Sequence, residues 1–227
     1  MRRASTGHAS RGSALSGSTH PLLVAPRHRE ISVARRTLDV AVVLLAAPFV
    51  LPVVLVLAVV IKLDSSGPVL YRNKRLGAGG RGFEMIKLRT MVTNAESLRA
   101  ELLARNSLSW PDFKVQHDPR VTRVGRWMRA ATLDELPQLW HVLRGDMTLV
   151  GPRASFIAIS DYELWQTERL EYRPGLFGSW QADARGMAAF DDRCRMDIRD
   201  RRLQSVGADL ALSVGSIIAV LTRNGRR

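Results

Sequence analysis

Two adjacent carboxylates, Asp134 and Glu135, are the residues best suited to chemistry in this chain. They lie in a segment, residues 118–153, that also contains several arginines, three prolines and three glycines. Pro137 follows closely, and proline is tolerated in the first turn of a helix because the N–H it lacks would be unpaired there. We therefore predict a helix that starts near Asp134, where free N–H groups and the helix dipole favour an ionised, nucleophilic carboxylate.

A purely structural interpretation of the same residues is open. Thr132 followed three residues later by Glu135 matches a capping box, in which both side chains only complete a helix start. Pro137 argues against this, because a cap at Thr132 would place the proline at the fifth helical position. The local pattern leaves capping and catalysis about equally supported.

The composition narrows the class of partner. The 227 residues suffice for one ordinary domain with an appendage, and 34 Lys and Arg against 21 Asp and Glu give a net charge of +13. Such a surplus indicates an anionic partner, which includes nucleic acid, phospholipid and phosphorylated substrates. The single cysteine, Cys194, excludes an internal disulfide, and with no His or Cys cluster beside it we interpret it as an incidental thiol.

An apolar run covers residues 40–61 and is long enough to cross a bilayer. Pro48 and Pro52 interrupt it, and proline kinks a helix. Basic residues flank both ends, which predicts that both ends face the cytoplasm and that the helix enters the membrane, breaks at Pro52 and returns. An ordinary kinked transmembrane helix is the alternative. Residues 1–28 are rich in Ser, Gly and Arg without apolar periodicity, which is typical of a disordered basic tail.

The rest of the chain alternates short β-prone and helical segments. Two β-prone segments flank a glycine-rich stretch, residues 77–82, and predict a hairpin whose glycines form a plain turn or cradle a phosphate. Residues 92–106 have the apolar spacing of an amphipathic helix that packs on the core or lies at a membrane interface. Further helices are expected at 155–170 and 191–224, with a short strand or loop at 180–185.

Three segments together resemble a known family. They are residues 82–91 (GFEMIKLRTM), 134–153 (DELPQLWHVLRGDMTLVGPR) and 173–185 (RPGLFGSWQADAR). In this order and spacing they are similar to the bacterial sugar transferases, also called small monotopic polyprenol-phosphate phosphoglycosyl transferases. The resemblance extends over about residues 35–224.

The resemblance implies a role for individual positions. It makes Asp134 the nucleophile, Glu135 its partner and our candidate Mg²⁺ ligand, and Arg129 a basic residue of the catalytic site. It makes Pro52 the hinge that turns the helix back into one leaflet. Other matching positions are Arg35, Arg36 and Asp39 at the start of the membrane segment, the turn Gly151, Pro152 and Arg153, and Gln181 and Arg185 near the nucleotide.

Some positions depart from the family pattern. Leu51 stands where Ser is common, Ala154 replaces the usual Pro, and His141 replaces the usual Asn. Phe177 and Ala184 replace a usual Thr and Gly, which puts the inherited substrate contacts near residues 175–185 in doubt. A lone His in an apolar helix is more often a satisfied structural residue than a base, and we interpret His141 in that way.

The implied fold is mainly α with short β elements. A re-entrant membrane helix at 29–63 and amphipathic interfacial helices would surround a small cytosolic catalytic domain at 64–227, after the tail at 1–28. The implied place is the cytoplasmic face of the bacterial plasma membrane, with the protein monotopic in the phospholipid bilayer.

The implied reaction moves a sugar-1-phosphate from a nucleoside diphosphate sugar, usually a UDP-sugar, to a polyprenol phosphate, with Mg²⁺ as cofactor and no nucleic acid partner. An aspartyl-phosphosugar intermediate would link the two halves, and the product would initiate exopolysaccharide or other glycoconjugate synthesis. Basic side chains match phosphate oxygens, so Lys87, Arg89, Arg129 and Arg153 are candidate phosphate contacts. The alternative is a membrane-anchored basic module that binds anionic lipid or nucleic acid without chemistry.

Overall fold

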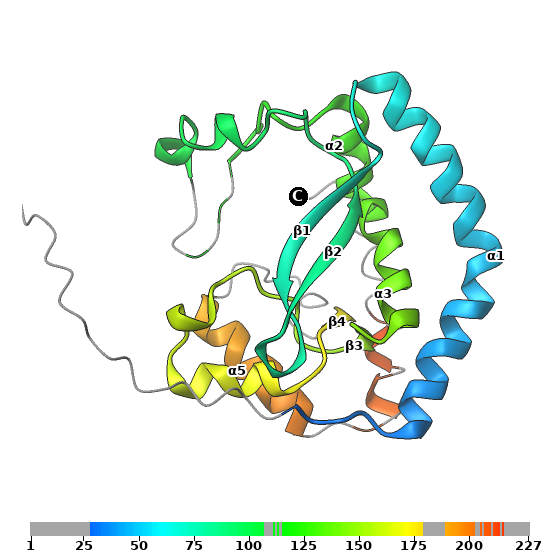
Figure 1. The fold of residues 1–227 in the computed structure, drawn as a ribbon, viewed down its shortest axis with the longest axis vertical. Coiled ribbons are helices and arrows are strands. Elements are labelled where there is room, and N and C mark those ends of the chain that lie inside the picture. Colours follow the sequence, from blue (N-terminus) through cyan, green and yellow to red (C-terminus); the bar gives the residue numbers. More distant parts are fainter. Residues whose placement is uncertain are drawn as a thin grey trace, which may run out of the picture.

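The computed structural model describes residues 28–106, 111, 113, 115–178, 189–202, 205, 207–209, 211–213 and 215. The described chain is mainly helical with short strands, as the sequence predicts (Figure 1). The expected basic tail lies, but for His28, outside the described residues, as does the segment 180–185.

The longest element, α1 (Val33–Asp64), is one helix of 32 residues that contains both Pro48 and Pro52. Its helical assignment continues through both prolines, so the break expected at Pro52 is absent. In Figure 1 the helix instead bows outward and both of its ends turn toward the rest of the domain. A proline removes one backbone hydrogen bond of the helix and crowds the preceding turn. The helix then bends, but the hydrogen bonds of the neighbouring turns keep it helical.

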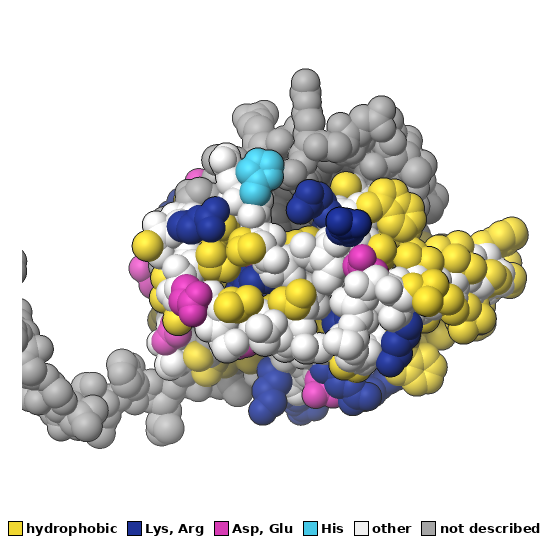
Figure 2. Space-filling view, turned by 90° about the horizontal axis from the view of Figure 1, so that it is seen from above, with side chains coloured by type: hydrophobic (Ala, Val, Ile, Leu, Met, Phe, Trp, Pro, Cys, Tyr) yellow, Lys and Arg dark blue, Asp and Glu magenta, His cyan; other side chains and the backbone are white. Residues whose placement is uncertain are grey.

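Apolar side chains cover the outside of α1. Figure 2 shows this helix as a projecting arm of hydrophobic side chains on the right of the molecule. Leu45, Phe49, Leu55 and Val56 are all more than 60% exposed, and the helix is long and apolar enough to cross a membrane. Such a contiguous exposed apolar surface is typical of a segment that contacts lipid or another apolar partner.

Both ends of α1 are fixed to the same domain. Near its start, Asp39 is buried and accepts hydrogen bonds from the Thr148 hydroxyl (2.6 Å) and the Leu149 N–H (3.2 Å). Arg36 donates to the carbonyls of Val142 and Leu143, at 2.5 and 2.6 Å.

At its other end, the carboxylate of Asp64 accepts a hydrogen bond from the Val124 N–H at 3.3 Å. The guanidinium of Arg89 donates to the carbonyls of Ser65 and Ser66 at 2.6 and 2.5 Å, next to the last turn.

The predicted hairpin is confirmed. Strand β1 (Leu70–Leu76) pairs antiparallel with β2 (Gly82–Leu88), with Leu70 opposite Leu88. The short 3₁₀ helix η1 (Ala78–Gly80) lies between them, and Gly79 and Gly80 have positive φ angles that glycine adopts without strain. Gly77 N–H donates to the Arg81 carbonyl at 2.7 Å and Gly80 N–H to the Gly77 carbonyl at 3.1 Å. These N–H groups are used within the turn, which favours the plain turn over a phosphate cradle.

A second, parallel pair joins β3 (Thr148–Val150) to β4 (Gly175–Phe177). Two glycines allow the approach: a Cβ on Gly175 would lie 1.9 Å from the Gly151 nitrogen, and one on Gly151 would lie 2.5 Å from the Arg173 carbonyl oxygen. The backbone after β3 is therefore held against β4.

Two apolar clusters attach α1 to the elements that surround the acidic pair. Val43 packs with Val142 and Met147, which belong to α3 (Leu139–Arg144) and the turn after it. Leu57 and Ile61 pack with Leu88 of β2 and with Met128 of α2 (Arg123–Ala130).

One predicted helix is wrong, and another is formed only in part. Residues 92–106 form turns with two short 3₁₀ helices, η2 (Ser97–Arg99) and η3 (Leu103–Arg105), and of the predicted apolar stripe only Leu102 is buried. Most helical stability comes from packing of an apolar face, and this stripe has little surface to pack on. Residues 155–158 are irregular, and the rest of the predicted helix at 155–170 is formed as two 3₁₀ helices, η5 (Ile159–Asp161) and η6 (Leu164–Glu171). The predicted helix after residue 190 is confirmed as α5 (Phe190–Arg202).

Candidate functional site

The acidic pair lies in a 3₁₀ helix, η4 (Leu133–Gln138), which leads directly into α3. Thr132 is its N-cap residue, with a positive φ of 57°, and its side chain makes no capping hydrogen bond. The capping box is therefore not formed. The helix begins at Leu133, one residue before Asp134, and Pro137 is accommodated within it.

Two cations bind the carboxylate of Glu135. The Lys87 Nζ lies 2.6 Å from its Oε1, and an Arg153 Nη lies 2.8 Å from the same oxygen. Lys87 comes from β2 and Arg153 from the turn after β3, so these two ion pairs connect both segments to η4. These two contacts outweigh burial and hold the pKa of Glu135 well below its usual range. Glu135 is thus ionised and fixed in place.

Asp134 differs from its neighbour. Within the part of the chain that the structure describes, no other residue makes a side-chain hydrogen bond or an ion pair with its carboxylate. Burial raises its pKa and so does the negative charge of Glu135, while Lys87 and Arg129 act in the opposite direction. A backbone hydrogen bond at the start of η4 does favour the ionised form, as expected, but burial outweighs it and the pKa of Asp134 is raised. A carboxylate of raised pKa is the more basic nucleophile once ionised.

Helix α2 places Arg129 near Asp134. Thr122 caps this helix and accepts the Gly125 N–H at 3.0 Å. A Cβ on Gly125 would lie 2.1 Å from the Thr90 carbonyl oxygen, so only glycine lets α2 pack against the end of β2. Arg129 Nε then donates to the Thr90 hydroxyl at 2.8 Å.

The Arg153 turn is held from two sides. Gly175 N–H donates to the Pro152 carbonyl and Gly151 N–H to the Phe177 carbonyl, at 2.8 and 2.9 Å. The Arg153 carbonyl accepts a hydrogen bond at 3.0 Å from Arg169. The Gly-Pro-Arg turn thus places one guanidinium beside Glu135.

The structure does not bring every predicted site residue together. Arg89 is 6% exposed and donates to the backbone at the end of α1, so its side chain closes that helix and does not reach the acidic pair. Arg89 follows Lys87 by two residues, and in a continuous strand the two side chains would point to the same face. Because β2 ends at Leu88, this alternation does not extend to Arg89. Gln181 and Arg185 lie outside the described residues.

The structural interpretation of His141 is confirmed. It is 2% exposed, its Nε2 accepts the Ile86 N–H at 3.1 Å, and its Nδ1 lies 2.9 Å from an Asp146 carboxylate oxygen. Both ring nitrogens are therefore occupied. The ring ties β2 to α3 one residue before Lys87. The interpretation of Cys194 as an incidental thiol also agrees with its surroundings, since it is fully buried and burial raises its pKa to about 11.

Two further polar residues near Glu135 were missed by the sequence interpretation. Arg75 of β1 and Gln138 at the end of η4 line a small recess together with Arg153. Gln138 is 3% exposed, although it is polar and follows Pro137. The sequence gives little signal for it, since η4 and α3 also carry Asp134, Glu135 and the buried His141.

A divalent cation would find few protein ligands here. Within the described ranges, no three His, Cys, Asp or Glu side chains group as a metal site. Mg²⁺, however, usually takes one or two carboxylates and completes its shell with water and substrate phosphates. The adjacent carboxylates of Asp134 and Glu135 fit that mode, and both cations on Glu135 use Oε1.

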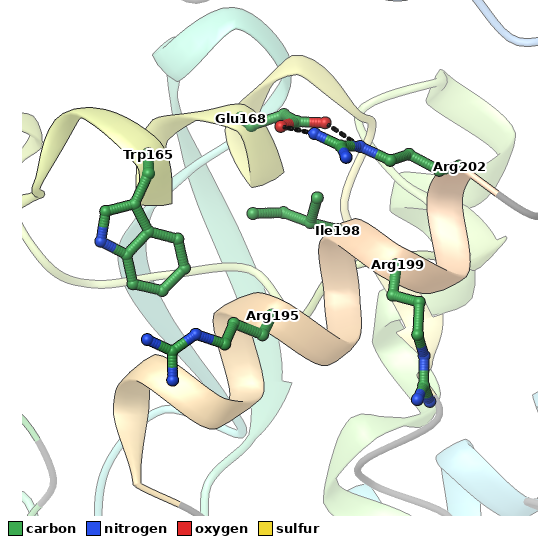
Figure 3. A pocket seen from close by; sticks show the side chains of 6 residues that line it. All are labelled: Trp165, Glu168, Arg195, Ile198, Arg199 and Arg202. Atoms are coloured by element: carbon green, nitrogen blue, oxygen red, sulfur yellow. Dashed lines mark hydrogen bonds and ion pairs between the residues drawn. The ribbon is translucent and has the colours of Figure 1, made fainter.

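The larger cavity lies elsewhere, between η6 and α5 (Figure 3). Its volume is about 400 Å³, and Trp165, Ile198 and four charged residues line it. Figure 3 shows Arg202 turned onto Glu168, and the two side chains pair at 2.5 and 2.8 Å. None of its lining residues belongs to the cluster around Asp134.

A protein-family model matches most of the chain. The model of the family described as "Bacterial sugar transferase" matches residues 30–223. The matched range contains α1, the hairpin, the acidic pair and α5.

Several curated proteins are similar to the chain. The "UDP-glucose:undecaprenyl-phosphate glucose-1-phosphate transferase" of Caulobacter vibrioides is 37% identical over 203 residues, which are 85% of this chain and 71% of that protein. The "Exopolysaccharide production protein ExoY" of Sinorhizobium fredii is 33% identical over 200 residues, 85% of this chain and 88% of that protein. The "Undecaprenyl-phosphate galactose phosphotransferase" of Salmonella typhimurium is 35% identical over 199 residues, 84% of this chain and 41% of that protein. The chain spans about two fifths of the length of several such relatives.

Proposed function

This chain belongs to the bacterial sugar transferase family, and from that premise we propose that it transfers a sugar-1-phosphate from a nucleoside diphosphate sugar to a membrane polyprenol phosphate. Relatives named as undecaprenyl-phosphate sugar phosphotransferases support the reaction class, and a relative named for UDP-glucose supports a uridine donor. The observation that carries the proposal is the contrast within the acidic pair. Glu135 is fixed by two cations, whereas Asp134 is free to react.

In the first step, an Asp134 carboxylate oxygen attacks the sugar-proximal phosphorus. The bond from that phosphorus to the bridging oxygen breaks, and its electron pair leaves with the nucleoside monophosphate. The product on the protein is an aspartyl-phosphosugar. Lys87 and Arg153 provide positive charge close to the attack, which offsets the repulsion between two anions.

In the second step, a polyprenol phosphate oxygen attacks the same phosphorus. The bond between the phosphorus and the Asp134 oxygen breaks, which restores the carboxylate and yields a polyprenyl diphosphate sugar. Splitting the reaction lets two bulky substrates use one site in turn, and it predicts ping-pong kinetics. The product would begin the assembly of exopolysaccharide or another glycoconjugate, as the name of the Sinorhizobium relative suggests.

Mg²⁺ fits this proposal as the cofactor, with Asp134 and Glu135 as its protein ligands. When bound, it would neutralise charge on the substrate phosphates. Glu135 also binds Lys87 and Arg153, so part of its contribution is to hold both cations at the site.

The attachment of α1 supports a monotopic, re-entrant arrangement at the cytoplasmic face of the membrane. Arg36 and Asp39 fix its start, and Asp64 and Arg89 fix its end, all to one domain. A helix that spans a bilayer would place its ends on opposite sides, and one compact domain could not hold both. The apolar outside of the bow would then lie in one leaflet, with the bend near the two prolines.

The topology can be tested by thiol labelling. Val33 and Leu63 lie at the two ends of α1, and each is 83% exposed. Cys194 is fully buried with a raised pKa, so it should give little background. In right-side-out and inverted vesicles, Val33→Cys and Leu63→Cys should both react with an impermeant maleimide from the cytoplasmic side. Labelling from opposite sides would defeat the re-entrant arrangement.

The activity is tested with a nucleotide sugar that carries label in its sugar-proximal phosphate. Membranes with the wild-type chain should release nucleoside monophosphate and retain label on the protein, in a Mg²⁺-dependent way. Asp134→Asn should lose both. Undiminished release of nucleoside monophosphate by Asp134→Asn would show that the reaction does not pass through Asp134.

A further inference from the structure

A recess of about 10 Å³ lies beside the acidic pair, between β1, η4 and the Arg153 turn. This volume admits about one water-sized atom. Met85 and Met147, which are 4% and 1% exposed, form apolar walls. Polar contacts that are shielded from bulk water are stronger than exposed ones, and an unmade hydrogen bond at a buried atom is correspondingly costly.

The polar side chains that line the recess carry hydrogen-bond donors that lack acceptors. Gln138 is 3% exposed, and its amide nitrogen has no hydrogen-bond partner. Arg75 Nε is likewise buried without a hydrogen-bond partner. Its Nη1 makes a long contact, 3.5 Å, to the Ala154 carbonyl, and its guanidinium lies 5.1 Å from the centre of the Phe156 ring. Arg153 lines the same space while it binds Glu135. Buried donors in folded proteins are nearly always paired, so these groups need an acceptor.

Positive charge also exceeds negative charge around the recess. Four cations interact with Asp134 or Glu135, namely Lys87, Arg75, Arg129 and Arg153. The other acids that act on them are already paired, Asp118 with Arg120 and Asp197 with Arg169. Burial, together with the neighbouring Arg153, lowers the pKa of Arg75 to about 10. An uncompensated buried cation is unfavourable, and an anionic ligand would remove the imbalance.

We propose that Gln138, Arg75 and Arg153 form a subsite that receives one oxygen of a substrate phosphate group. The space takes a single atom, and that atom must accept hydrogen bonds from guanidinium and amide N–H groups and offset the surplus of positive charge. A phosphoryl oxygen carries no hydrogen and bears negative charge, so it fits both requirements. The identity of the phosphate as substrate rests on the proposed function.

Four variants separate this role from a structural one. Gln138→Leu keeps most of the volume and removes the donor. Gln138→Glu places a carboxylate among the same donors, where it imitates the bound oxygen. Arg75→Gln removes one cation. The control is Arg72→Gln, on the same strand, because Arg72 forms an exposed pair with Glu84 at 3.0 Å and lies away from the recess.

The first measurement is binding of inorganic pyrophosphate to the purified full chain in detergent, followed by calorimetry and by the shift in unfolding temperature. Gln138→Leu and Arg75→Gln should each weaken binding about tenfold, since each removes a hydrogen bond to a charged group. Gln138→Glu should bind still more weakly, and without ligand it should unfold at a higher temperature than wild type. Arg72→Gln should match wild type. Wild-type binding by Gln138→Leu, or a lower unfolding temperature for Gln138→Glu, would overturn the subsite.

Two more ligands distinguish the sources of the phosphate. A nucleoside diphosphate sugar in solution and a short-chain prenyl monophosphate in micelles are titrated into the same variants. Loss of affinity for the first, for the second or for both assigns the subsite to the donor, to the acceptor or to a position used by each in turn. Unchanged affinity for both would contradict the proposal. These assays need no turnover, so a failed covalent-labelling experiment would count against the proposed function and leave the subsite standing.

Discussion

Two cavities in the described part of this protein differ in a way that identifies the site. The cavity between η6 and α5 is the larger, at about 400 Å³ against about 10 Å³, but its charges are matched. Arg202 binds Glu168, Arg195 lies 3.5 Å from Asp192, and Arg199 lies 3.7 Å from Asp200. The recess beside Asp134 is small, yet cations exceed anions around it and buried donors lack partners. Unmatched charge and unpaired donors, more than volume, mark the place where an anionic substrate belongs.

The largest expected effect compares one glutamate from each region. Glu135→Gln leaves Lys87 and Arg153 without their shared anion, so activity should fall by about 10³-fold and the free energy of unfolding by about 3 kcal/mol. Glu168→Gln removes an ion pair at the rim of the large cavity and should leave both unchanged. Steady-state kinetics and denaturant unfolding give the two quantities. Equal losses in the two variants would break the comparison.

A smaller effect concerns the backbone that forms a wall of the recess. In Gly175→Ala the new methyl group collides with the Gly151 backbone, so the protein should lose about 3 kcal/mol of stability. Gly207 has no atom within 4 Å of an added Cβ and lies in a helical segment, so Gly207→Ala should be neutral or stabilise by up to about 1 kcal/mol. Urea unfolding of both variants provides the measurement. A tolerated Gly175→Ala would mean that the Arg153 turn is not held as described.

The pH dependence of kcat/KM should respond to charges beside Asp134 and not to charges in the large cavity. Asp134 must lose its proton to attack, and because burial raises its pKa, the acidic limb of kcat/KM should lie above the ordinary aspartate range of about 3.9. Lys87 lowers that pKa, so Lys87→Met should move the limb to higher pH in its residual activity. Arg199→Gln, in the large cavity, should not move it. A limb that shifts to lower pH in Lys87→Met would contradict this account.

The smallest expected effect is at the large cavity itself. Trp165→Ala opens the cavity and removes the cation–π contact with Arg195, which lies 5.0 Å from the ring centre. Because the cavity shares no residue with the cluster around Asp134, kcat and KM should stay within about twofold of wild type. Initial rates with both substrates varied would detect a larger change. Such a change would show that the large cavity takes part in the reaction.

Much of the fold follows from local patterns. The apolar run predicts α1, and the β-prone segments around the glycines predict the hairpin with its turn. The helix at 92–106 fails because periodicity does not say whether a surface is present to cover the stripe. The bend of α1 also depends on tertiary contacts, since Arg36 and Arg89 hold its ends while the prolines only weaken its middle.

The site residues also divide into those that the sequence predicts and those that only the structure reveals. The family motif identifies Asp134 and Glu135, and basic chemistry identifies Lys87 and Arg153, which the structure brings to Glu135. Arg89 has the same chemistry, but the end of β2 turns it toward α1. Gln138 and Arg75 escape notice because their importance depends on which donors remain unpaired, and only the packed structure determines that.

The central claim is that Asp134, and not the fixed Glu135, carries the phosphosugar. Borohydride reduces an acyl phosphate to an alcohol, so trapping the enzyme during turnover with a nucleotide sugar converts the modified acid into a distinct residue. Peptide mass spectrometry should find homoserine at position 134 and an unaltered Glu135. Reduction at position 135, or trapped enzyme with no altered residue at all, would contradict the account.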